Sequence, residues 1–177
     1  MAAARCGGHC AAAALRNRIF ILGGNRTRVL EVFNTALLEW RAEARLCDMP
    51  GERSSAAAVV LQNRYLVLIG GEDEEEEATA GCLIYDCSIN QWSSTPASIN
   101  MITGRDYHTA AVLDGKVVVA GGACYDGRLS DVRGLSSVEC IDARDLLEYA
   151  PLDYPLPVEY FNQVLQLGKV LLVTKHT

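Results

Sequence analysis

The 177-residue sequence has no long apolar segment. Its longest apolar stretches, such as residues 56–61 and 66–69, fall far short of the roughly 18 residues that a membrane-spanning helix needs. Near the N-terminus, residues 7–10 (GGHC) interrupt the alanines that would otherwise form the apolar part of a signal peptide. We therefore expect no membrane span and no signal peptide, and we expect a cytoplasmic location.

The sequence also has no basic stripe. Its 16 Lys and Arg residues stand against 22 Asp and Glu residues, and residues 72–77 are all acidic, so the excess of negative charge is local. Without concentrated basic charge the chain has little attraction for nucleic acid or for an anionic membrane, and we expect neither as a partner. Hydrophobic residues make up 50% of the chain and charged residues 21%, which indicates a packed core and excludes intrinsic disorder.

Signatures of metal binding and catalysis are scarce. The seven cysteines are an odd number in a chain long enough to fold without disulfides, so we expect reduced thiols, mostly buried as small apolar side chains. Cys6, His9 and Cys10 have a spacing that zinc ligands can have, but no second pair with finger spacing follows. No P-loop, GxSxG or HExxH motif is present. We expect no cofactor, no metal and no catalytic residue.

What the sequence does contain is a repeat. Glycine pairs recur at intervals of about 50 residues, at 23–24, 70–71 and 121–122. A short apolar run directly precedes each pair, at residues 19–22, 66–69 and 117–120. Such runs, rich in β-branched residues, predict strands buried on both faces. Another apolar segment precedes each run across a polar break typical of a tight hairpin. The breaks are Arg16-Asn17, Asn63-Arg64 and Asp114-Gly115.

Each unit continues with a third predicted strand, at residues 29–33, 82–85 and 138–141. A polar residue follows each of these strands, and a tryptophan, Trp40 or Trp92, lies six positions further on in the first two units. The third unit has Glu148 at that position, with Tyr149 beside it.

This order of hairpin, glycine pair, third strand and tryptophan resembles the kelch repeat. Arg53 and Arg105 at the start of their units agree with the family pattern, as do His9 and His108, which we take as repeat equivalents. The resemblance implies an all-β fold, an incomplete kelch-type β-propeller of four-stranded antiparallel blades. It covers residues 1–177, with approximate units at 5–49, 53–99 and 105–150 and a partial fourth unit at 158–177.

Kelch propellers usually have six blades, so three blades and a hairpin are expected to leave the ring open. Open blade edges and uncovered apolar faces must be hidden in a soluble protein. The chain is then a fragment of a longer propeller, a subunit that pairs with a second copy, or an open crescent. We expect a fragment, with self-association through the open edges as a further possibility.

The resemblance favours a non-catalytic protein-interaction module, and the alternative is a fragment of a kelch-propeller enzyme of the copper oxidase or sugar isomerase type. The residues expected to be structural are Gly23, Gly24, Gly70, Gly71, Gly121, Gly122, Trp40, Trp92, Arg53 and Arg105. In kelch proteins, partners commonly bind at the loops after the glycine pair and at the loops leading into the next blade. The partner-binding candidates in those loops are Asn25, Arg26, Arg28, Glu52, Glu74, Glu75, Asp106, Tyr107, Tyr125, Asp126 and Arg128. The acidic run suits a basic segment, although runs of like charge are more often solvated, disordered loops.

Overall fold

The computed structural model describes residues 9–24, 27–41, 46–125 and 132–151. The predicted fourth unit at 158–177 lies outside these ranges. Among the helices of the described ranges, none is long and apolar enough to cross a membrane.

Sheet 1 and sheet 2 are four-stranded antiparallel sheets with the same strand order. Sheet 1 has the order β1-β2-β3-β4 and sheet 2 the order β5-β6-β7-β8, so neighbours in sequence are neighbours in space. The strands of sheet 1 are β1 (Ala11–Leu15), β2 (Arg18–Leu22), β3 (Leu30–Asn34) and β4 (Glu39–Arg41). Those of sheet 2 are β5 (Ala57–Leu61), β6 (Tyr65–Ile69), β7 (Cys82–Asp86) and β8 (Gln91–Ser94), followed by the short 3-10 helix η1 (Ala97–Ile99).

Sheet 3 departs from the expected four strands. It contains β9 (Thr109–Leu113), β10 (Lys116–Ala120) and β13 (Val138–Asp142). A separate two-stranded ribbon, β11 (Ala123–Tyr125) and β12 (Val132–Gly134), is inserted between β10 and β13. Where sheets 1 and 2 have a fourth strand, the chain forms the helix α1 (Ala143–Leu147), capped by the Asp142 side chain.

The three hairpins form where the polar breaks predict them. Asp114 and Gly115 both have a positive φ and connect β9 to β10, as in the two-residue turns that match strand twist. Arg16 and Asn63 also have a positive φ in the β1–β2 and β5–β6 turns. The predicted hairpin positions are therefore confirmed.

The polar residue after each third strand has one recurring role. Asn34, Asp86 and Asp142 each accept, through a side-chain oxygen, the backbone N–H two residues further on, at 2.9, 2.8 and 2.9 Å. In sheets 1 and 2 this bond turns the chain back into a fourth strand, whereas Asp142 starts a helix.

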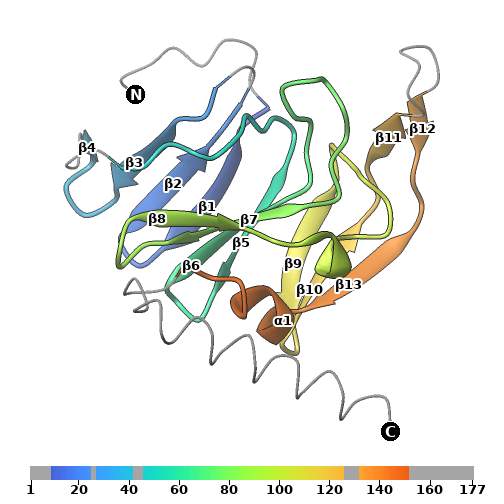
Figure 1. Cartoon of the computed structure of the whole chain (residues 1–177). Coiled ribbons are helices and arrows are strands. Elements are labelled where there is room, and N and C mark those ends of the chain that lie inside the picture. The colour runs from blue at the N-terminus through green and yellow to red at the C-terminus, as the bar shows by residue number, and fades with distance from the viewer. Residues whose placement is uncertain (1–8, 25–26, 42–45, 126–131, 152–177) are drawn as a thin grey trace, which may run out of the picture.

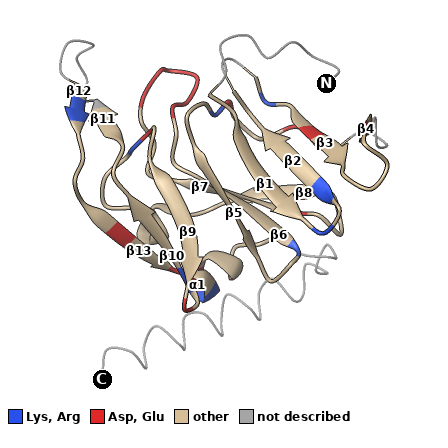
Figure 2. Ribbon diagram, turned by 180° about the vertical axis from the view of Figure 1, so that it is seen from behind, with Lys and Arg blue, Asp and Glu red and all other residues tan. Residues whose placement is uncertain are grey.

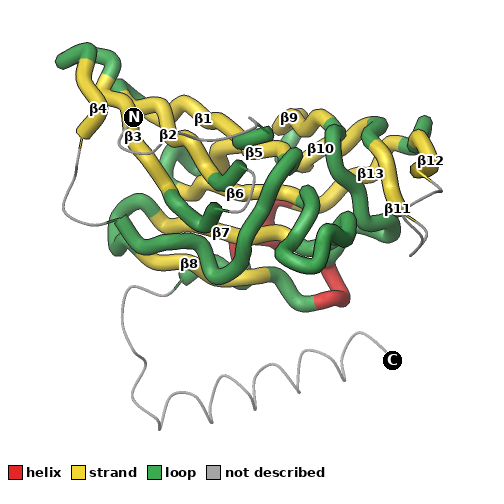
Figure 3. Tube along the Cα trace, turned by 90° about the horizontal axis from the view of Figure 1, so that it is seen from above, coloured by secondary structure: helices red, strands yellow, loops and turns green. Residues whose placement is uncertain are grey.

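The three sheets stand side by side, with their first strands β1, β5 and β9 adjacent (Figures 1 and 3). One apolar cluster lies between sheets 1 and 2, and a second lies between sheets 2 and 3. Phe20 and Leu66 belong to the first cluster, and Ile84 and Val117 belong to the second. Stacked sheets that each cover the next are the arrangement of a propeller that is not closed.

A chain of backbone hydrogen bonds joins the starts of the three first strands. The N–H of Tyr107 donates to the carbonyl of Ser55 at 2.9 Å, and the N–H of Ser55 donates to the carbonyl of His9 at 2.7 Å. All three residues have a left-handed φ between 49° and 60°. His9 is thus the repeat equivalent of Tyr107, and the predicted equivalence with His108 is wrong by one residue. A histidine precedes β1 by two residues and β9 by one, so matching the two histidines shifts the alignment by one residue, whereas the backbone bonds align His9 with Tyr107.

Candidate functional site

The acidic run forms an ordered turn after β6. Oδ1 of Asp73 accepts the backbone N–H groups of Glu75 and Glu77 at 3.1 and 3.0 Å, and the N–H of Asp73 donates to the carbonyl of Glu77 at 3.1 Å. Residues 74–77 remain exposed to solvent. The tendency of like charges to leave a loop disordered is overcome here because one carboxylate of the run ties the backbone together.

A short bridge holds this turn against the loop that leads into β5. Ser54 and Glu72 exchange two backbone hydrogen bonds of 3.0 and 2.9 Å, and the Ser54 hydroxyl lies 3.0 Å from Oε2 of Glu72. The loop after the glycine pair of sheet 2 and the loop between sheets 1 and 2 therefore meet.

Where the two loops meet they form a pocket of about 290 Å³. Five carboxylates contribute to its wall and no Lys or Arg does. Figure 2 shows the acidic turn at the edge of the sheets that lies away from α1. The lining residues are Gly24, Glu52, Ser54, Glu72, Asp73, Glu74 and Glu76. We call this the acidic pocket.

Arg53 lies within electrostatic reach of the acidic turn. Burial lowers the pKa of Arg53, while the charges of Asp73 and Glu74 act to raise it. Its Nη1 donates to the carbonyl of Glu52 at 2.8 Å. The guanidinium thus offsets part of the negative charge of the turn, although Arg53 is not among the residues that line the pocket.

The structure brings two of the predicted partner-binding residues together, since Glu52 and Glu74 both line the acidic pocket. Glu75 belongs to the same turn but does not line the pocket. Nε of Arg28 donates to the carbonyl of Met49 at 2.6 Å, which ties two loops together. Asp106 is fully buried, whereas Tyr107 beside it is 58% exposed. Asn25, Arg26, Asp126 and Arg128 lie outside the described residues, and Tyr125 is placed only as the last residue of β11.

A second pocket, of about 410 Å³, lies at the opposite ends of the strands, between the β1–β2 and β5–β6 turns. Arg16, Arg18 and Arg64 line it together with neutral residues. This cluster is not evident from the sequence, because each arginine, taken alone, is only a polar residue in or beside a hairpin turn. The signal that could have found it is that the same turn of two successive repeats carries arginine.

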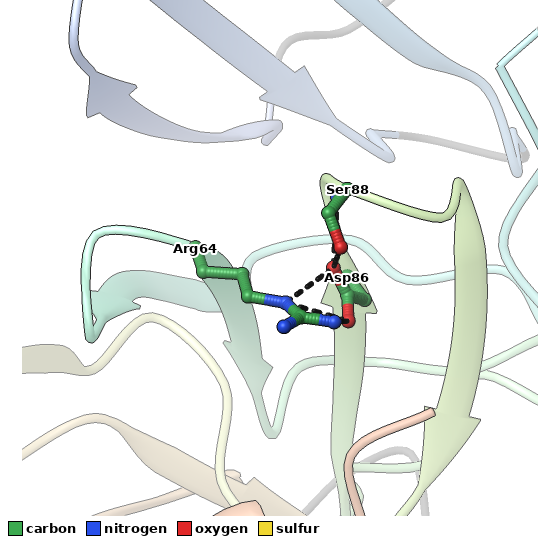
Figure 4. Close-up of polar contacts among 3 residues, drawn as sticks. All are labelled: Arg64, Asp86 and Ser88. Atoms are coloured by element: carbon green, nitrogen blue, oxygen red, sulfur yellow. Dashed lines mark hydrogen bonds and ion pairs between the residues drawn. The ribbon is translucent and has the colours of Figure 1, made fainter. Parts of the chain in front are cut away.

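Arg64, whose side chain is 34% exposed, also forms an ion pair with the buried Asp86 at this end of sheet 2 (Figure 4). Its Nη2 lies 2.5 Å from Oδ2 of Asp86, and Nε lies 3.0 and 2.9 Å from the two carboxylate oxygens. Burial acts to raise the pKa of Asp86, but the guanidinium and two hydrogen bonds from Ser88 outweigh it and hold that pKa below its ordinary value. Asp86 therefore stays charged in the folded protein and fixes the β5–β6 turn against the end of β7.

Arg105 joins sheets 2 and 3. Its side chain is fully buried and donates to the carbonyls of Gly121 and Ser137 at 3.0 and 3.3 Å, to the Ser137 hydroxyl at 3.1 Å and to the carboxylate of Glu139. Its own carbonyl accepts the N–H of Gly71 at 2.8 Å. Arg105 thus ties the loop before β9 to the glycine pairs of sheets 2 and 3 and to β13.

The two tryptophans differ in their surroundings. Nε1 of Trp92 donates to the carbonyl of Cys47 at 2.9 Å. The backbone N–H of Cys47 donates to Oδ1 of Asn90, also at 2.9 Å. Trp92 therefore holds the connection between sheets 1 and 2 as well as packing on Tyr85. Trp40 packs edge-on against Phe33 and is 41% exposed.

His108 makes the stability of the fold sensitive to pH. Burial and, second, the charge of Arg105 lower its pKa. The unfolded chain therefore binds a proton more readily, so stability is complete above the ordinary value of 6.5 and falls as the pH drops below it. We expect a slope of at most about 1.4 kcal/mol per pH unit from this one group.

The measurement is urea unfolding between pH 8 and pH 5 for the wild type and for His108→Gln. The variant should lose the part of the pH dependence that His108 causes. The difference in free energy of unfolding between the two proteins should be constant well above pH 6.5 and should change below it. Parallel curves over the whole range would contradict the assignment.

The described cysteines, Cys10, Cys47, Cys82, Cys87, Cys124 and Cys140, are all free. Burial raises the pKa of Cys82 and Cys87 to about 12, so both thiols stay protonated at neutral pH and act as apolar groups. Cys10, Cys47 and Cys140 are exposed, and for these three the prediction of buried side chains is wrong. Within the described ranges, no three His, Cys, Asp or Glu side chains come together in a way that could hold a metal ion.

The comparison with known families agrees with the geometry of the three sheets. The model of the KLHDC2/KLHL20/DRC7 Kelch-repeats domain matches residues 8–142. The chain belongs to the kelch-repeat family. The match spans all strands of the kelch sheets 1, 2 and 3 and ends with β13. A kelch-repeat domain indicates, in general terms, a protein-interaction module. A comparison with the curated proteins finds no match.

Proposed function

We propose that this kelch-repeat chain is a non-catalytic interaction module that binds a Lys- or Arg-bearing segment of a partner protein in the acidic pocket. The observation that carries the proposal is the meeting of five carboxylates from two loops around one concave space. Kelch repeats as a class support a protein partner. The odd number of cysteines supports a reducing, cytoplasmic location.

The chemistry of the pocket wall favours a cation with several hydrogen-bond donors. A carboxylate accepts charge-assisted hydrogen bonds from ammonium or guanidinium groups, and a guanidinium is bound by two oxygens at once. Glu74 and Glu76 contribute from the acidic turn, and Glu52 contributes from the facing loop. A basic side chain that enters the pocket is thus approached by carboxylates from two sides, whereas an acidic segment is repelled.

The test compares two double variants of the same turn. Glu74→Gln/Glu76→Gln neutralises two residues that line the pocket, and Glu75→Gln/Glu77→Gln neutralises two exposed neighbours that do not. Both variants change the net charge equally. With a fluorescent oligo-arginine peptide as the probe, we expect the lining variant to bind roughly tenfold more weakly and the matched variant to bind within about twofold of the wild type.

The salt dependence provides a second readout. Binding of the peptide should weaken as the ionic strength rises, and an oligo-glutamate peptide of equal length should not bind. Equal losses in the two double variants would show that only the general charge of the turn attracts the peptide and would refute a specific pocket.

A further inference from the structure

Each sheet has a forward face, toward the next sheet along the chain, and a backward face, toward the preceding one. On sheet 2 the forward face is apolar and buried, with Leu61 at 3% and Ile84 at 0% exposure. It packs on the backward face of sheet 3, which contributes Val117, Val119 and Ile141 to the shared cluster. The six forward-face residues of sheet 2 are Val59, Leu61, Val67, Ile69, Cys82 and Ile84.

The same contact occurs once more between sheets 1 and 2. The forward face of sheet 1 packs on Leu66, Leu68, Leu83 and Tyr85 of the backward face of sheet 2. Its residues are Ala13, Leu15, Phe20, Leu22, Leu30 and Val32. The same type of interface between neighbouring sheets therefore occurs twice in the described part of the chain.

The forward face of sheet 3 is uncovered in the described part of the chain. It has the same apolar character, but Leu113 and Val138 are each 61% exposed. The cross-strand register places its six residues at the positions that are buried in sheets 1 and 2. They are Ala111, Leu113, Val118, Ala120, Val138 and Cys140.

The backward face of sheet 1 is the matching half of the same interface, and among the described residues no sheet covers it. Its apolar side chains occupy the positions at which Leu66, Leu68 and Tyr85 of sheet 2 are buried against sheet 1. Ala12, Ala14 and Trp40 are exposed, and Ile19, Ile21 and Phe33 are half-buried. Except at Glu31, which occupies the position of Leu83 in sheet 2, the two free faces therefore correspond to the two sides of a contact that the chain already makes twice.

We propose that the forward face of sheet 3 receives the backward face of sheet 1 of a second copy of this chain. Two copies related by a twofold axis make this contact twice, so no such face remains exposed. The pair then contains six sheets, which lies within the four to eight blades of closed propellers. The contact joins apolar faces of sheets and leaves the edges of the blades unpaired with one another.

The first measurement is analytical ultracentrifugation of the full chain over a range of concentrations. We expect the mass of two chains in the wild type. Leu113→Lys should raise the dimer dissociation constant at least about tenfold, because it places an unpaired ammonium among alkyl groups in the contact. Ile102→Lys is the matched control, since Ile102 is 93% exposed and lies outside both faces.

Mixing two variants tests which faces meet. Leu113→Lys blocks the forward face of sheet 3, and Ala14→Lys blocks the backward face of sheet 1. Neither variant should pair with itself as the wild type does, but an equimolar mixture should form a pair through the one intact contact. Thermal unfolding of each variant shows whether it is still folded.

A wild-type monomer overturns the proposal, and this is the outcome expected if residues 152–177 of the same chain cover sheet 3. Polymers larger than two chains, or a dimer that Leu113→Lys leaves intact, overturn it as well. Failure of the mixture to pair excludes the forward-to-backward contact. None of these results depends on the acidic pocket, whose peptide binding is measured separately.

Discussion

Replacing Arg105 by leucine should lower the free energy of unfolding by about 3 to 5 kcal/mol, because the change leaves the carboxylate of Glu139 without its buried cation. The carbonyls of Gly121 and Ser137 also lose donors, in a region where the arginine side chain is fully buried. A loss of this size is a large part of the total stability of a domain. Urea denaturation followed by tryptophan fluorescence measures it.

Two controls separate the ion pair from the loss of a large side chain. Arg53 is the equivalent residue of the preceding repeat, and sheet 2 has Leu83 where sheet 3 has Glu139. Arg53→Leu should therefore cost only about 1 kcal/mol. The double variant Arg105→Leu/Glu139→Gln has no unpaired carboxylate at residue 139. Its free energy of unfolding should therefore be higher than that of Arg105→Leu, although still below that of the wild type. Equal losses for Arg53→Leu and Arg105→Leu would contradict the role given to Glu139.

Replacing Gly23 by alanine should destabilise the fold far more than the same change at Gly121. Both glycines have a left-handed φ, +60° and +69°, so both variants carry a similar backbone strain of about 1 kcal/mol. A Cβ at Gly23 would lie 2.2 Å from the carbonyl oxygen of Arg53, whereas at Gly121 the nearest atom is 3.7 Å away. We expect a further loss of about 1 to 3 kcal/mol at Gly23 alone.

The two substitutions are chemically identical and occur at equivalent positions in the repeat, so the turn contributes about equally to both losses of stability. The difference between their thermal unfolding midpoints measures the clash with the next repeat. If the two variants unfold together, the first glycine of each pair serves only the turn and not the close approach between sheets.

The sequence was sufficient to predict the features that depend on local chemistry. Hairpin turns at Asp114-Gly115 and the strands before each glycine pair follow from turn preference and from apolar runs, and the structure confirms them. The strands of sheet 3 were harder to predict, because the β11–β12 ribbon is inserted in the sequence between β10 and the third strand, β13. Asp142 caps a helix where Asn34 and Asp86 begin a turn into a fourth strand, and the missing tryptophan at Glu148 was the only sign of that change.

The candidate site was predictable in part. Glu52 and Glu74 were identified separately, by their place in the loops of a kelch repeat, and the structure unites them in one pocket. Their meeting depends on the bridge between Ser54 and Glu72, a tertiary contact that no local pattern encodes. The burial of Asp106 beside the exposed Tyr107 likewise depends on the neighbouring strand β11, to which Asp106 is bridged.

The backbone bonds that link His9, Ser55 and Tyr107 have a consequence for how such a protein diversifies. Each sheet is attached to the one before it by an N–H and a carbonyl, which every residue except proline possesses in full. The three side chains at this position are an imidazole, a hydroxyl and a phenol, so the attachment tolerates unrelated chemistry. A unit duplicated or exchanged within the array keeps this attachment to its neighbours. The side chain at this position can then vary where it is exposed, as at His9 and Tyr107, but not where it is buried, as at Ser55.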